Sequence, residues 1–92
     1  MELKLQIERF LLEDILSGGR AALDPQEPLV GMNGLLDSLG LLRLIQFVEE
    51  AFQIRVGDGD VGEDNFGTLE RLVAFVARKR QEASGGSTST AS

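Results

Sequence analysis

The chain has no cysteine and no histidine among its 92 residues. Disulfides, thiolate nucleophiles and zinc sites built from cysteine and histidine are therefore excluded. A Ser-His-Asp triad and a histidine general base are excluded in the same way. No paired-acid motif takes their place, so the composition argues against an enzyme that acts through its own side chains.

Aromatic residues are scarce, with five Phe and no Trp or Tyr, so the core must be built mainly from Leu, Ile and Val. Met1 is not followed by a basic stretch and an apolar run, and this argues against a secretory signal. No apolar run approaches the roughly 20 residues that a membrane span needs. We therefore expect a cytoplasmic protein without a membrane span.

The formal net charge is −6, which disfavours nucleic acid and favours partners with basic patches. Seven acids fall between residues 37 and 64, against two bases: Asp37, Glu49, Glu50, Asp58, Asp60, Glu63 and Asp64, with Arg43 and Arg55. A solvated acidic face is the alternative interpretation. The run from Asp58 to Gly62 lacks the ligand order of an EF-hand, so we predict no metal site.

Apolar residues recur at helical spacing in three segments, and no segment alternates as a strand would. In the first, over 3–16, they are Leu3, Ile7, Phe10, Leu11 and Ile15. In the second, over 38–52, they are Leu41, Leu44, Ile45, Val48 and Phe52. The last begins after the N-cap Thr68 and contains Leu69, Leu72, Val73 and Val76. The fold class predicted is all-α.

The segments between these helices differ in character. Ser17, Gly18 and Gly19 should end the first helix. The long loop that follows, to about Asp37, should pack on the bundle through Leu29, Val30, Met32, Leu35 and Leu36. The Gly- and Asp-rich stretch 57–67 can hold at most a short helical turn. We predict one folded domain over residues 1–80 and a disordered Ser/Gly/Thr tail over 81–92.

The segment Gly34-Leu35-Leu36-Asp37-Ser38-Leu39-Gly40 opens the strongest predicted helix. Asp and Ser are preferred N-cap residues, and capping alone could explain them. The same geometry also suits attachment of a phosphate ester, because a helix N-terminus presents unpaired N–H groups and a partial positive charge. Both interpretations remain open at this stage.

Three motifs together resemble the acyl carrier protein family over about residues 7–78: Asp37-Ser38-Leu39, Phe47 to Ile54, and Phe66-Gly67-Thr68-Leu69. The resemblance implies a bundle of three main helices and one short helix, with a long first loop. It also implies that Ser38, flanked by Asp37 and Leu39, receives 4′-phosphopantetheine from coenzyme A. The thiol of that arm would carry an acyl or aminoacyl thioester, and the protein would be a carrier rather than a catalyst.

The implied partners are a phosphopantetheinyl transferase, an acylating or adenylating enzyme, and a downstream acyl-accepting enzyme. A candidate docking stripe faces outward from the second helix: Leu39, Arg43, Gln46 and Glu50. The core side of this helix, with Leu29, Ile54 and the last helix, would line a cargo cavity. We expect the carrier to be a monomer.

The chain departs from the family at Arg43, where carriers of fatty acid synthesis usually have Glu. Arg43 either favours another partner, and thus a specialised pathway, or is a solvated residue paired with Glu50. The local sequence around Ser38 resembles that of D-alanyl and peptidyl carriers. Fatty acyl, polyketide and amino acid cargo all remain open. The alternative function is a small helical interaction module without a prosthetic group.

Overall fold

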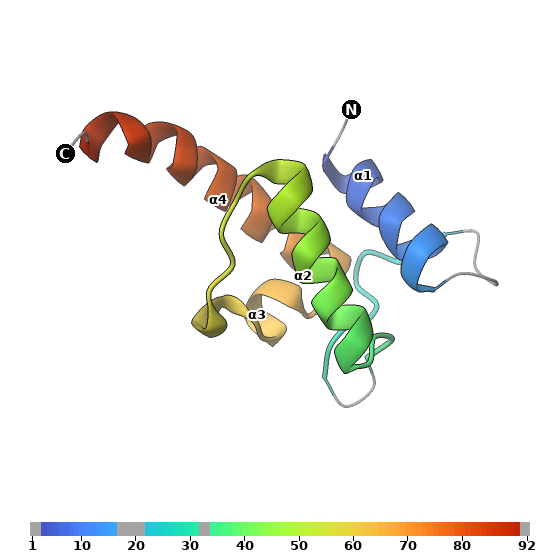
Figure 1. The fold of residues 1–92 in the computed structure, drawn as a ribbon. Coiled ribbons are helices and arrows are strands. Elements are labelled where there is room, and N and C mark those ends of the chain that lie inside the picture. Colours follow the sequence, from blue (N-terminus) through green and yellow to red (C-terminus); the bar gives the residue numbers. More distant parts are fainter. Residues whose placement is uncertain (1–2, 17–21, 32–33, 91–92) are drawn as a thin grey trace.

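The computed structural model describes residues 3–16, 22–31 and 34–90, with the backbone alone given over 83–90. Within these residues the fold is helical and contains no strand, which confirms the predicted all-α class (Figure 1). The order of elements is α1 (Leu3–Phe10), the π-helical turn η1 (Leu11–Ile15), α2 (Ser38–Phe52), the 3₁₀ turn η2 (Asp58–Asp60), α3 (Glu63–Phe66) and α4 (Leu69–Thr90). No helix among the described residues is long and apolar enough to cross a bilayer.

The first helical segment extends from α1 into η1 without interruption. Its wider last turn is closed by the Leu16 N–H, which donates to the Leu11 carbonyl at 2.7 Å. Ile7 and Leu11 are fully buried, as their spacing predicts, and Leu3, Phe10 and Ile15 pack against the same core. The predicted helix stop at Ser17 to Gly19 lies outside the described residues.

Helix α2 begins and ends where the sequence predicted. Its end is set by Gln53, which adopts a left-handed conformation (φ 56°) and donates its N–H to the Glu49 carbonyl. On the helix, Leu44, Val48 and Phe52 are buried in the core. Leu41 and Ile45 are partly buried and pack against this core, as their spacing predicts.

The loop before α2 packs on the bundle as predicted. Leu29 is fully buried, and its N–H donates to the Gly67 carbonyl at 2.7 Å. In the first turn of α4, the Glu70 N–H donates to the Pro25 carbonyl at 3.0 Å. Val30, Leu35 and Leu36 lie against the core, whereas Met32 lies outside the described residues. The loop is therefore held against the start of α4 by backbone hydrogen bonds and by burial.

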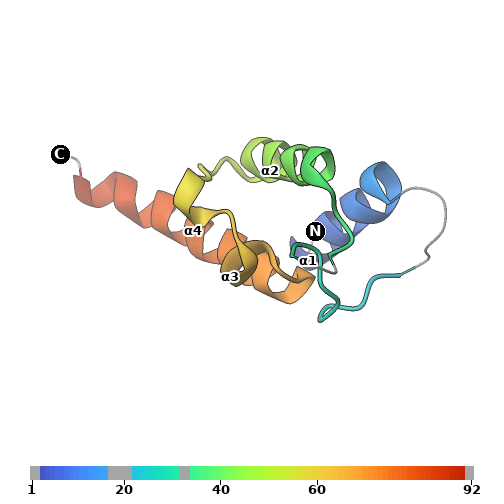
Figure 2. The ribbon, with the colours of Figure 1, turned by 90° about the horizontal axis from the view of Figure 1, so that it is seen from below.

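Helix α4 is the element on which α1 and α3 pack (Figure 1). Thr68 begins it as predicted, since its hydroxyl accepts the Arg71 N–H at 3.1 Å. Phe75, which the predicted apolar face of this helix did not include, is almost fully buried, and its ring centroid lies 5.5 Å from that of Phe66. Figure 2 shows α2 on one side of the molecule and α3 with α4 on the other, and the segment 53–62 leads from α2 to α3. That segment therefore crosses from one layer to the other.

The C-terminal part of α4 differs from the sequence prediction of a disordered tail over 81–92, because the structure continues the helix to Thr90. Extending an existing helix costs far less than starting one, since each added residue gains a backbone hydrogen bond. The Arg80 guanidinium lies over the Phe52 ring at 5.7 Å, so contacts with the bundle reach the predicted boundary. Beyond it, α4 projects away from the other helices (Figure 1). The boundary at residue 80 stays a prediction.

Candidate functional site

Ser38 is the first residue of α2 and is exposed. The residue before it, Asp37, has an extended backbone and caps the helix, with its carboxylate Oδ1 accepting the Gly40 N–H at 2.7 Å. The Asp37 carbonyl accepts the Leu41 N–H at 2.9 Å, which closes the first turn. The predicted cap is therefore formed by Asp37, and the Ser38 hydroxyl is not needed for it.

Two backbone N–H groups of the first turn, those of Ser38 and Leu39, have no acceptor among the described residues. Such groups, with the partial positive charge of a helix N-terminus, favour an anionic oxygen nearby. The third N–H of the turn, that of Gly40, is already bonded to the Asp37 carboxylate. The geometry at Ser38 therefore fits a phosphodiester on its hydroxyl.

The chain before Asp37 is positioned by close backbone packing. The Leu35 N–H donates to the Pro28 carbonyl at 3.1 Å, and the Leu36 N–H donates to the Leu29 carbonyl at 2.9 Å. At Gly34, a Cβ atom would lie 2.5 Å from the Leu29 carbonyl oxygen, which no real side chain tolerates. The glycine that opens the motif is thus required by the close approach of two chain segments immediately before the site.

A groove of about 400 Å³ begins at Ser38 and lies between α2 and the segment that contains η2. Its lining consists of Ser38, Leu41, Leu42, Ile45, Asp58 and Val61. Leu41 and Ile45 are apolar residues of α2 that are only partly buried. The predicted lining is met in part, since Leu41 and Ile45 belong to the predicted core side of α2, whereas Leu29 and Ile54 are core residues outside this groove.

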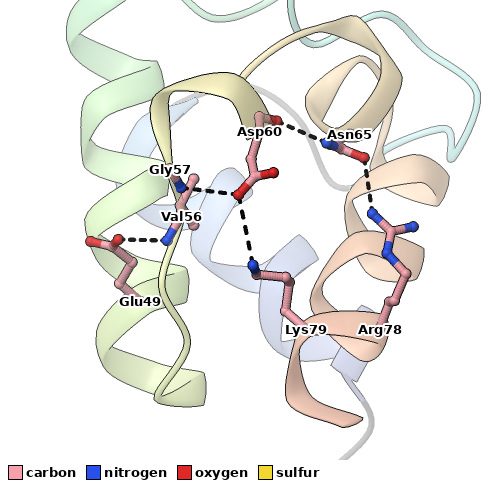
Figure 3. Close-up of polar contacts among 7 residues, drawn as sticks. All are labelled: Glu49, Val56, Gly57, Asp60, Asn65, Arg78 and Lys79. Carbon is pink, nitrogen blue, oxygen red and sulfur yellow. Dashed lines mark hydrogen bonds and ion pairs between the residues drawn. The ribbon is translucent and has the colours of Figure 1, made fainter. Parts of the chain in front are cut away.

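The far wall of the groove is tied to both neighbouring helices (Figure 3). Towards α2, the Glu49 carboxylate accepts the Val56 N–H at 2.8 Å. Within the wall, the Asp60 carboxylate accepts the Gly57 N–H at 3.0 Å, and it pairs with Lys79 of α4 at 3.8 Å. These contacts hold a Gly-rich segment that composition alone predicted to be weak.

Asn65 of α3 completes this network (Figure 3). Its side-chain amide donates to the Asp60 carbonyl at 2.9 Å and accepts from Arg78 at 3.4 Å. The basic residues near the end of the chain therefore have a structural role, which is to anchor the acidic segment that follows α2.

All four residues of the predicted docking stripe are exposed: Leu39, Arg43, Gln46 and Glu50. Leu39 is 65% exposed. Leu42, which the sequence analysis did not select, is 58% exposed and adjoins the stripe one turn after Ser38. No ion pair joins Arg43 to Glu50, although both lie within the described residues. Of the two interpretations of Arg43, the structure therefore disfavours the internal pair.

Comparison with known proteins gives one informative relative. No protein-family model matches the chain. The chain is 28% identical over 84 residues to the probable acyl carrier protein PigG of Serratia sp. (strain ATCC 39006). The match covers 91% of this chain and 95% of that protein, so it spans nearly the whole of both chains. Together with the helical architecture, this relative confirms the resemblance found in the sequence and supports the assignment of the chain to the acyl carrier protein family.

Proposed function

We propose that this protein is a stand-alone carrier that holds an acyl or aminoacyl thioester on a 4′-phosphopantetheine arm attached to Ser38. The observation that carries the proposal is the exposed Ser38 at a helix start whose cap is formed by its neighbour Asp37. The similarity to a probable acyl carrier protein over nearly the whole chain supports it. In this role the protein presents cargo to enzymes and catalyses no step itself.

The attachment step uses the Ser38 hydroxyl as a nucleophile. Its oxygen forms a bond to the phosphorus of coenzyme A that carries the pantetheine, and the bond from that phosphorus to adenosine 3′,5′-bisphosphate breaks. The hydroxyl proton passes to a base of the transferase. The N–H groups of Ser38 and Leu39, which have no acceptor among the described residues, would favour the negative charge of such a phosphodiester, as helix N-termini do. When bound, the arm supplies the thiol that the chain lacks.

The partners of such a carrier are a phosphopantetheinyl transferase, an acylating or adenylating enzyme and a downstream acyl-accepting enzyme. The exposed Leu39 and Leu42 flank the attachment point and offer them an apolar contact. Arg43 adds a positive charge at the centre of the docking stripe, so a partner surface with a carboxylate opposite it is favoured. This charge supports a specialised pathway over housekeeping fatty acid synthesis. Coenzyme A and these enzymes are expected in the cytoplasm, with the carrier as a monomer.

The competing function is a helical interaction module in which Asp37 and Ser38 only cap a helix. The test is to load the apo protein from acetyl-coenzyme A with a broad-specificity transferase and then to add hydroxylamine. A carrier gains the mass of acetyl-phosphopantetheine, and hydroxylamine then removes only the acetyl group, because it cleaves thioesters. The Ser38→Ala variant gains no mass. An unmodified wild-type protein that is shown to be folded would support the interaction module.

A further inference from the structure

The groove beside Ser38 has one charged lining residue, Asp58. We propose that this groove selects cargo with a protonated amine, as in an aminoacyl thioester, whose ammonium group pairs with the Asp58 carboxylate. The inference rests on the proposed carrier function and names its cargo class. Three observations support it: the neighbouring acids already have hydrogen-bond or ion-pair partners, the groove has an apolar lining, and the turn that carries Asp58 is anchored.

The Asp58 carboxylate is available to pair with a cation, whereas two nearby acids already have partners. The Glu49 carboxylate accepts the Val56 N–H, and the Asp60 carboxylate binds Gly57 and Lys79. No donor from the described residues pairs with the Asp58 carboxylate. No basic residue lines the groove. A cationic group on the cargo could therefore pair with the Asp58 carboxylate, and no Lys or Arg in the groove lining would compete for that carboxylate.

The rest of the lining limits the size and polarity of the cargo. Four residues provide an apolar surface, namely Leu41, Leu42, Ile45 and Val61. A volume of about 400 Å³ lies at the small end of ligand sites, so it suits a short side chain better than a long acyl chain. Asp58 is exposed, so solvent screens an ion pair with it on the open side, and only the apolar lining reduces the screening on the other side. An ammonium group next to a small apolar side chain matches this combination, whereas a carboxylated acyl group would be repelled.

Asp58 lies between Gly57 and Asp60, two residues of the network drawn in Figure 3. Asp58 begins η2, and the next turn is closed by the Val61 N–H, which donates to the Asp58 carbonyl at 3.4 Å. The same turn is anchored to α4 through Asp60 and Lys79. A carboxylate on an anchored turn loses less conformational freedom on pairing than one on a mobile loop.

The test loads the apo protein with coenzyme A analogues in which a stable amide replaces the thioester. One analogue carries a ¹⁵N-labelled alanyl group, the second carries a propionyl group of similar size, and the third is the bare arm. Intact mass verifies each loading first. Failure to load would overturn the carrier function, and the inference with it, before any titration begins.

The readout is the pKa of the alanyl amine, followed by NMR in the loaded wild type and in two loaded variants. Asp58→Asn should lower this amine pKa by about 0.5–1, because the neighbouring negative charge is removed. Asp64→Asn is the matched control, since Asp64 is an exposed acid of α3 outside the groove, and it should leave the pKa within experimental error of wild type. Equal pKa values in wild type and Asp58→Asn would overturn the inference. An equal effect of both variants would also overturn it, because the general acidic field would then be the cause.

The propionyl and bare arms separate the cargo amine from the amides of the arm itself. The Asp58 side-chain carboxyl signal should shift with the alanyl load and stay unchanged with the other two. If all three loads move this signal equally, the carboxylate contacts the arm rather than the cargo, and the inference is wrong.

Discussion

The Asp37 carboxylate accepts the Gly40 N–H at 2.7 Å, and this bond places Ser38 in the first turn of α2 with its side chain exposed. Gly40 is buried, and a Cβ on it would lie 3.2 Å from that carboxylate oxygen. The capping and the functional interpretations of this motif are therefore compatible, because Asp37 performs the first and leaves Ser38 available for the second.

Removal of the cap should destabilise the protein without abolishing the fold. Asp37→Ala is expected to cost about 1 kcal/mol of unfolding free energy, which lowers the melting temperature of a domain this size by about 4–8 °C. Asp37→Asn should retain most of the stability, because its side-chain oxygen still accepts the Gly40 N–H. Thermal melts followed by circular dichroism measure both. Equal melting temperatures for Asp37→Ala and wild type would contradict the assigned cap.

Gly34 is expected to tolerate no side chain. Gly34→Ala places a Cβ against the Leu29 backbone and should cost about 1–3 kcal/mol, since the two segments must separate. Gly59→Ala is the matched control, because no atom lies within 4 Å of the added Cβ. Urea unfolding of both variants gives the comparison. A Gly34→Ala protein as stable as Gly59→Ala would show that the close approach is absent.

Gln53 ends α2 in the left-handed region, where a Cβ is unfavourable by about 1–2 kcal/mol. Its side-chain amide also donates to the Glu50 carbonyl at 2.9 Å, an exposed hydrogen bond that partly offsets this cost. Gln53→Gly should therefore be neutral or stabilising by up to about 1 kcal/mol, and Gln53→Val should be clearly destabilising. Chemical denaturation measures the free energy of unfolding of both variants. A Gln53→Val protein that is more stable than Gln53→Gly would refute the assigned helix end.

The two acids of η2 should differ in their effect on stability. Asp60→Ala removes the acceptor for the Gly57 N–H and the partner of Lys79, at an expected cost of about 1–2 kcal/mol. Asp58→Ala should change stability by less than about 0.5 kcal/mol, because its carboxylate supports no contact with described residues. Denaturant titrations of the two variants distinguish them. The reverse order would mean that the network of Figure 3 is not formed.

Truncation after Arg80 tests the predicted domain boundary. The segment 81–92 contains little that could be buried, so its deletion should shift the melting temperature by no more than about 2 °C. Deletion from Lys79 onward should destabilise more, because it removes the partner of Asp60 and the Arg80 contact with Phe52. A large loss of stability on the shorter deletion would place the tail within the domain.

The sequence predicted the extent of α2 because two local signals coincide there: the capping residues Asp37 and Ser38 at its start and an apolar stripe at helical spacing that runs to Phe52. It could not predict which members of that stripe face the groove, since the burial of Leu41 and Ile45 depends on where η2 lies. The different roles of Asp58 and Asp60 were equally hidden. They depend on Lys79, which is distant in the sequence and becomes a neighbour only in the folded chain.

The most direct test of the account is peptide mapping by mass spectrometry after incubation with coenzyme A, magnesium and a broad-specificity phosphopantetheinyl transferase. We predict one added phosphopantetheinyl group per chain, located on Ser38, in the wild type and in Asp58→Asn but absent from a folded Ser38→Ala variant. A folded wild-type protein that stays unmodified with several transferases, or that is modified at another serine, would contradict the carrier assignment.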